Sequence, residues 1–119
     1  MTEQILLALL VGHYLADFGL QTHEQAIEKY KGAWELVSHV SVYTLVMFLV
    51  YLTFDMNLNH AFIFAVITWV SHYVTDVITS NIGKPFWRRE DPHNGFVVIG
   101  MDQIAHYLQL YITVKFLII

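Results

Sequence analysis

The chain has 119 residues, of which 56% are hydrophobic and only 13% are charged, which lies outside the usual balance of a soluble domain. Its net charge of -4 and its six basic residues exclude a strongly basic nucleic-acid-binding protein. Because the chain has no cysteine, disulfides and thiolate metal ligands are excluded, and any metal must be bound by nitrogen and oxygen atoms.

Four apolar stretches follow one another, each close to the ~20 residues that a helix needs to cross a lipid bilayer. They cover residues 4–21, 34–54, 60–79 and 96–119. Residues 40–54 and 108–119 are apolar around nearly the whole helix, which disfavours a soluble bundle with a polar face. The sequence therefore predicts one all-α domain over residues 1–119, an integral membrane bundle of four transmembrane helices surrounded by the lipid bilayer.

The connections between these stretches predict the topology. Five of the six basic residues lie in connections 22–33 and 80–95, whereas connection 55–59 has none. By the positive-inside rule, the first two connections are cytoplasmic. We therefore expect a multi-pass protein of the cell inner membrane with both termini outside.

Polar residues that are costly in lipid occur inside the apolar stretches. Three stretches each contain a His and an Asp four residues apart, which puts both side chains on one helical face. These pairs are His13 with Asp17, His72 with Asp76, and Asp102 with His106. The remaining stretch contains His39. An ionised Asp in mid-membrane costs about 2.5–3.5 kcal/mol on insertion scales, so three of them need a common partner such as a divalent cation.

The depth of these residues supports one shared metal site. At about 1.5 Å per residue, all of them lie roughly 5–15 Å below the cytoplasmic surface. The predicted metal ligands are His13, Asp17, His39, His72, Asp76, Asp102 and His106. Their number and their nitrogen and oxygen atoms predict one or two divalent transition metal ions, with zinc favoured and manganese or iron as alternatives. Asp17, Asp76 and Asp102 are the candidate catalytic carboxylates, with acid and base roles unassigned.

Further polar residues border this layer and are candidates for substrate binding. They are Gln21, Gln103, Lys84, Arg88 and Arg89. The two glutamines lie within one turn of a predicted ligand. The three basic residues stand at the predicted cytoplasmic mouth, where they either bind an anionic group or only set the topology.

Four elements of the sequence form a recognisable pattern: H-x-x-x-D-F-x-x-Q at residues 13–21, a histidine at 39, H-x-x-x-D at 72–76, and D-Q-x-x-H at 102–106. This pattern resembles that of a bacterial and phage family known as domain of unknown function 3307, over nearly the whole chain. The resemblance implies a membrane protein with a polar His/Asp core and brings no established activity. The family often has a Lys where this chain has Ser80. By looser analogy, the chain is similar to membrane-bound metal-dependent hydrolases.

These features favour a membrane-embedded, metal-dependent hydrolase that cleaves a phosphoester or a similar polar bond at the cytoplasmic leaflet. A bound cation lowers the pKa of water, and a spare carboxylate would handle the proton. The expected substrate is a phospholipid or a phosphorylated small molecule, and a homo-oligomer is left open. The alternatives are a metal-ion or proton transport protein, haem binding by paired histidines, and a purely structural His/Asp core.

Overall fold

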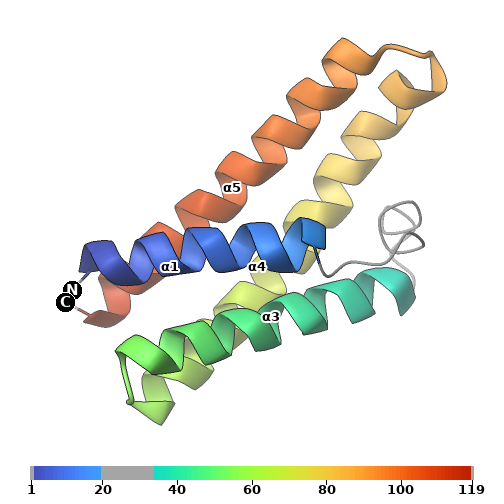
Figure 1. Ribbon diagram of the computed structural model, residues 1–119. Coiled ribbons are helices and arrows are strands. Elements are labelled where there is room, and N and C mark those ends of the chain that lie inside the picture. Colours follow the sequence, from blue (N-terminus) through green and yellow to red (C-terminus); the bar gives the residue numbers. More distant parts are fainter. Residues whose placement is uncertain (1, 20–33, 119) are drawn as a thin grey trace.

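The structure is a computed structural model that describes residues 2–19 and 34–118. Within these ranges the chain is helical apart from two short connections (Figure 1). The helices are α1 (Thr2–Tyr14), which continues as the π-helical segment η1 (Leu15–Gly19), α3 (Trp34–Phe54), α4 (Leu58–Arg88) and α5 (Pro92–Ile118). The predicted all-α fold is confirmed.

The helices alternate in direction and form a bundle. α1 contacts α3 and α5, and α4 also contacts α3 and α5. Figure 1 shows the start of α1 and the end of α5 side by side at one end, together with the α3–α4 connection. The α4–α5 connection lies at the opposite end, where these two helices extend beyond α1 and α3 as a hairpin. The arrangement agrees with the alternating helices that the sequence predicts.

Two helix boundaries differ from the prediction. α4 does not end near residue 79 but continues to Arg88, and α5 begins at Pro92 rather than at residue 96. Pro85 lies inside α4, although a proline in a helix costs about 3 kcal/mol. Gly83, two residues before Pro85, is buried where α4 packs against Val98 of α5. Most of the predicted connection 80–95 is therefore helical.

Capping residues explain where the α4–α5 hairpin reverses. Glu90 has a φ of 56°, in the left-handed region that commonly follows the end of a helix. Asp91 then accepts a hydrogen bond of 3.3 Å from the backbone N–H of Asn94, and Pro92 occupies the first helical position, as is usual at a helix start. The hydrogen bonds from Asn94 lower the pKa of Asp91.

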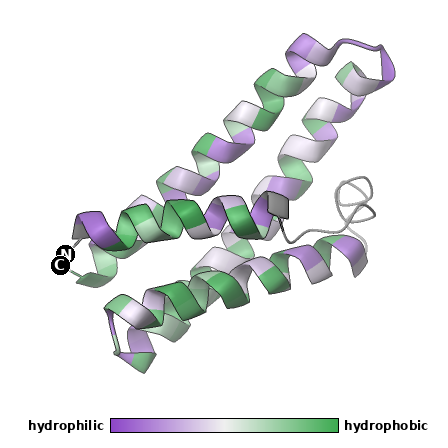
Figure 2. Cartoon of the chain, viewed as in Figure 1, coloured by the Kyte–Doolittle hydropathy of each residue, from purple (hydrophilic) through white to green (hydrophobic). Residues whose placement is uncertain are grey.

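α3 and α4 are each long and apolar enough to cross a membrane. Only 39% of the apolar window of α3 and 28% of that of α4 are buried in the bundle, whereas a core helix of a soluble protein is mostly buried. Figure 2 shows that hydrophilic residues concentrate at the α4–α5 connection. α1 has 13 residues and η1 adds 5, and α5 carries polar residues. Two of the four predicted membrane spans are thus supported, and the other two stay predictions.

An apolar core holds the four helices together near the chain ends. Its buried side chains are Ile5, Leu9, Ala16, Tyr43, Met47, Tyr51, Ala61, Phe64, Leu110 and Val114. Every helix contributes to this core, so the helices are fixed in register with one another. The His and Asp residues lie in the adjoining part of the bundle.

Gly95→Ala is expected to destabilise the α4–α5 hairpin. A Cβ atom at position 95 would lie 2.6 Å from Cε2 and Cζ2 of Trp87, so the ring or the helix must move. We expect the free energy of unfolding to fall by about 1–3 kcal/mol, measured by thermal unfolding in detergent. The control is Gly100→Ala, because a Cβ there meets no atom within 4 Å and Ala favours the helix. Equal losses in both variants would contradict this packing.

Candidate metal centre

The structure brings all seven predicted ligands together inside the bundle. α1 and η1 carry His13 and Asp17, α3 carries His39, α4 carries His72 and Asp76, and α5 carries Asp102 and His106. All seven side chains are buried, with exposed fractions from 0% for His13 to 6% for Asp102. Residues that are up to 93 positions apart in the chain thus share one site.

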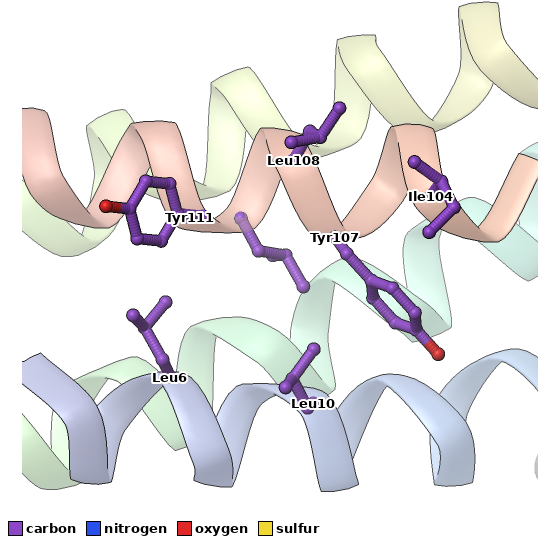
Figure 3. A pocket seen from close by; sticks show the side chains of 7 residues that line it. Leu6, Leu10, Ile104, Tyr107, Leu108 and Tyr111 are labelled. Carbon is purple, nitrogen blue, oxygen red and sulfur yellow. The ribbon is translucent and has the colours of Figure 1, made fainter.

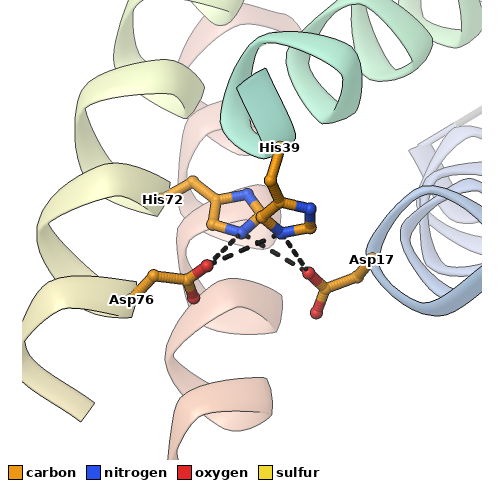
Figure 4. Close-up of side chains that lie close together, drawn as sticks. All are labelled: Asp17, His39, His72 and Asp76. Carbon is orange, nitrogen blue, oxygen red and sulfur yellow. Dashed lines mark hydrogen bonds and ion pairs between the residues drawn. The ribbon is translucent and has the colours of Figure 1, made fainter. Parts of the chain in front are cut away.

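Four of these residues form the first group of possible ligands (Figure 4). His39 Nε2 lies 2.9 Å from Asp17 Oδ1 and 3.6 Å from Asp76 Oδ2. His72 Nε2 lies 3.5 Å from Asp17 Oδ1 and 3.1 Å from Asp76 Oδ2. Ligands at about 2.0–2.1 Å from a tetrahedral ion lie about 3.3–3.4 Å from each other. These four of the six separations in the group scatter around this value, so the group could hold a metal ion through two nitrogen and two oxygen atoms.

His72 gives a second indication of a cation. Within the described part of the chain, neither of its buried ring nitrogens has a hydrogen-bond partner. Its Nε2 lies 3.1 Å from Asp76 Oδ2 and 3.5 Å from Asp17 Oδ1, so two carboxylates face this nitrogen. Leaving a buried polar group unsatisfied costs about 1–3 kcal/mol. A cation held between Asp17, Asp76 and His72 would bind the lone pair of Nε2 and so account for that nitrogen.

The second group consists of Asp17, Asp102 and His106. His106 Nε2 lies 3.1 Å from Asp102 Oδ2 and also 3.1 Å from Asp76 Oδ1. Asp17 belongs to both groups, and Asp76 of the first group reaches His106 of the second. Asp17 and Asp76 therefore connect the two groups, and the cluster could hold one ion or two.

The π-helical segment η1 directs Asp17 toward the other helices. In the regular helices, His72 and Asp76 approach to 3.1 Å, as do Asp102 and His106. In α1 and η1, the corresponding distance from His13 Nε2 to Asp17 Oδ2 is 3.7 Å. The wider turn of a π-helix rotates the residues that follow it, and such turns are frequent at functional sites. Asp17 accordingly lies closer to His39 than to His13.

His13 lies beside the two groups and belongs to neither of them. Its Nδ1 is 2.6 Å from Tyr43 Oη, and its Nε2 is 2.6 Å from Gln103 Oε1. Gln103 Nε2 donates hydrogen bonds to Asp17 Oδ2 at 3.0 Å and to Asp102 Oδ2 at 3.1 Å. Gln103 thus holds His13 and two carboxylates in place. This placement supports a positioning role for Gln103 more than the predicted contact with substrate.

Two residues of the site escaped the sequence analysis. Tyr43 is fully buried against His13, and the Thr79 hydroxyl lies 2.5 Å from Asp102 Oδ1. Tyr43 follows His39 by four residues, and Thr79 follows Asp76 by three, so each lies on the helical face of a ligand. A search for polar residues one turn from each predicted ligand would have found both.

The other predicted substrate residues lie away from the cluster or are not described. Gln21 falls outside the described residues, as does connection 22–33. Arg88 ends α4 and Arg89 caps it, both exposed, with the Arg89 guanidinium 5.2 Å from the centre of the Phe86 ring. Arg88 lies roughly 18 Å along the helix from Asp76 at about 1.5 Å per residue. Because α4 is longer than predicted, the basic residues are farther from the site than expected.

The fold and the site together define an all-helical protein with a buried His/Asp cluster that could hold a metal ion. The chain belongs to the family described as protein of unknown function (DUF3307), whose family profile matches residues 5–119. The resemblance drawn from the sequence motifs is thereby confirmed. Comparisons with curated proteins and with solved structures found no match.

Proposed function

We propose that this chain is an integral membrane protein that binds one or two divalent transition metal ions and hydrolyses a phosphoester or a similar polar bond. The observation that carries the proposal is that seven buried His and Asp side chains from every helix meet in one cluster. Two groups of residues in this cluster could each hold a metal ion. Imidazole and carboxylate ligands suit the divalent transition metals that activate water for hydrolysis.

Exposed apolar side chains on every helix support a membrane location. Leu7 on α1, Leu45 on α3, Val66 on α4 and Phe116 on α5 are all more than half exposed. Soluble monomers rarely expose apolar surface so extensively. We therefore propose that all four helices lie in the bilayer, with the α4–α5 connection on the cytoplasmic side. The 31 residues of α4 span about 46 Å against a hydrocarbon core of about 30 Å, which leaves its basic end among the headgroups.

Asp102 is best placed to move a proton. It is the most exposed of the seven predicted ligands. The Thr79 hydroxyl donates a hydrogen bond to its Oδ1, and Gln103 Nε2 donates one to its Oδ2. A bound cation would lower the pKa of a water molecule and would neutralise charge on the phosphate. A water oxygen bonds to phosphorus, the bond from phosphorus to the leaving oxygen breaks, and Asp102 passes the water proton to that oxygen.

Transport is the less supported alternative. Polar side chains do continue for one turn beyond the cluster. There Gln109 Nε2 donates hydrogen bonds to Thr68 Oγ1 at 3.2 Å and to Thr113 Oγ1 at 3.0 Å. Beyond them, the buried side chains of Phe64 and Val114 belong to the apolar core. This layer closes the bundle on that side and favours a site that opens toward one membrane face.

The test is hydrolysis of bis(p-nitrophenyl) phosphate by the purified protein in detergent. We expect hydrolysis to stop on chelation and to return when Zn²⁺ or Mn²⁺ is added. Asp102→Asn should lower the rate by about 10²–10⁴-fold, the usual contribution of a general acid or base. The control is Asp91→Asn, because Asn also caps helices. A rate that chelation leaves unchanged would contradict the proposed function.

Gln103→Ala is expected to weaken metal binding without abolishing it. Loss of a residue that orients ligands usually costs about 10–100-fold in metal affinity. Gln109→Ala is the matched control, because Gln109 is also on α5 but hydrogen-bonds Thr68 and Thr113 instead of ligands. Titration against a chelating dye measures both affinities. Equal affinities of the Gln103 variant and the wild type would refute the positioning role.

A further inference from the structure

A groove of about 260 Å³ runs along the seam between α1 and α5 (Figure 3). Its lining consists of Leu6, Leu10, Ile104, Tyr107, Leu108, Leu110 and Tyr111. These side chains are aliphatic or aromatic, and the only side-chain polar atoms among them are the tyrosine hydroxyls. A charged or sugar-like ligand would lose its hydrogen bonds to water there, so the lining suits hydrocarbon.

One end of the groove reaches the His/Asp cluster. The ring of Tyr107 packs edge-on against the ring of His13, with 5.0 Å between their centres. Figure 3 shows the Tyr107 side chain extending across the seam toward α1. Ile104 lines the groove, and its neighbour Gln103 hydrogen-bonds Asp17 and Asp102. The same turn of α5 therefore forms the end of the groove and holds the carboxylates.

The groove and the basic residues lie on opposite sides of the cluster along the bundle. On α1, Leu6 and Leu10 precede His13, toward the end with the chain termini. Arg88 and Arg89 lie at the other end, at the α4–α5 connection. A phospholipid in the cytoplasmic leaflet has a matching order, with its acyl chains deep and its anionic phosphoester on the side of the basic headgroup-facing end of the bundle.

The size of the groove limits its occupant. A helix with its side chains is about 10–12 Å across. The groove, with a volume of about 260 Å³, is too small to enclose a helix of that width. A helix of a second copy is therefore a poor fit, whereas part of one extended hydrocarbon chain is a good one.

We propose that the α1–α5 groove binds one acyl chain of a bilayer phospholipid and so presents the phosphoester of that lipid at the Asp102 side of the cluster. This inference rests on the proposed function and names the substrate class of that site. Leu10 and Leu108 are the side chains that select the acyl chain, and Tyr107 separates the apolar groove from the polar cluster.

The test uses phosphatidylglycerol with a diazirine on one acyl chain, incorporated with the protein into nanodiscs. We expect photolabelling to concentrate on the groove-lining residues. Leu108→Trp should reduce it by at least about tenfold, the effect of 1.4 kcal/mol on binding. The matched control is Leu49→Trp on α3, because Leu49 and Leu108 are both 54% exposed. Leu10→Trp fills the groove from α1 and should repeat the loss, so a folding defect in one variant does not decide the outcome.

Labelling spread evenly over the apolar surface and unchanged in both groove variants would overturn the inference. The same samples are assayed for hydrolysis of phosphatidylglycerol and of bis(p-nitrophenyl) phosphate. We expect the groove variants to lose lipid hydrolysis and to keep hydrolysis of the water-soluble ester. If neither ester is hydrolysed while the groove is still labelled, the proposed function fails and the lipid-binding groove stands.

Discussion

Asp17→Asn is expected to lower metal affinity by more than the roughly 100-fold that the loss of an outer partner costs. Asp17 is the one residue common to both ligand groups, and its Oδ1 lies within 3.5 Å of the Nε2 atoms of His39 and His72. The amide of Asn keeps the shape of the side chain but removes its charge. All bound metal should therefore be lost, whether one ion or two, as measured by competition with a chelating dye and by elemental mass spectrometry.

Asp55→Asn is the matched control for this experiment. Like Asp17, Asp55 contacts a histidine, His60, at 2.9 Å, and it accepts a hydrogen bond of 2.9 Å from Tyr51. Burial raises the pKa of Asp55, but the hydrogen bonds from His60 and Tyr51 outweigh it and lower the pKa overall. Because Asp55 lies in the α3–α4 connection, its replacement should leave metal affinity unchanged. An Asp17→Asn variant that binds metal like the wild type would show that Asp17 is not a metal ligand.

Metal removal is expected to destabilise the folded protein by several kcal/mol. Asp17, Asp76 and Asp102 lie in one buried cluster, where their charges repel each other unless a cation or protons compensate them. A ligand that binds only the folded state adds about 4 kcal/mol at a free concentration 1,000 times its Kd. Thermal unfolding in detergent, with and without chelator, measures the difference.

The double variant Asp17→Asn/Asp76→Asn is the comparison for metal removal. It lacks two of the three negative charges, and its amide oxygens bind metal more weakly than carboxylates do, so chelator should not change its unfolding temperature. Acidification should act like the chelator on the wild type, because carboxylates and imidazoles must be deprotonated to bind metal. A wild type that is insensitive to chelator would mean that hydrogen bonds alone stabilise the cluster.

The cluster could be predicted because its signals are local. A spacing of four places His72 and Asp76 on one face of a helix, and the cost of charge in an apolar stretch forces such faces together. The π-helical turn at Leu15–Gly19 has no comparable signal in the sequence. The prediction therefore grouped Asp17 with His13, whereas the structure turns Asp17 toward His39 and His72.

The length of α4 could not be predicted for a different reason. Gly83 and Pro85 are normally signals of a turn or a helix end. In the structure they lie inside α4, where Gly83 is buried against Val98 of α5. This contact depends on tertiary packing between two helices and leaves no pattern in either segment alone. The groove between α1 and α5 escaped prediction for the same reason.

Elemental mass spectrometry of the detergent-purified wild type, beside Asp76→Asn and His106→Ala, tests metal binding most directly. The expected result is one or two equivalents of zinc, manganese or iron per wild-type chain, with a clear loss in both variants. A folded wild-type protein without bound metal, which still binds none when zinc is added, would contradict a metal centre. The His/Asp cluster would then be a hydrogen-bonded core or a proton relay.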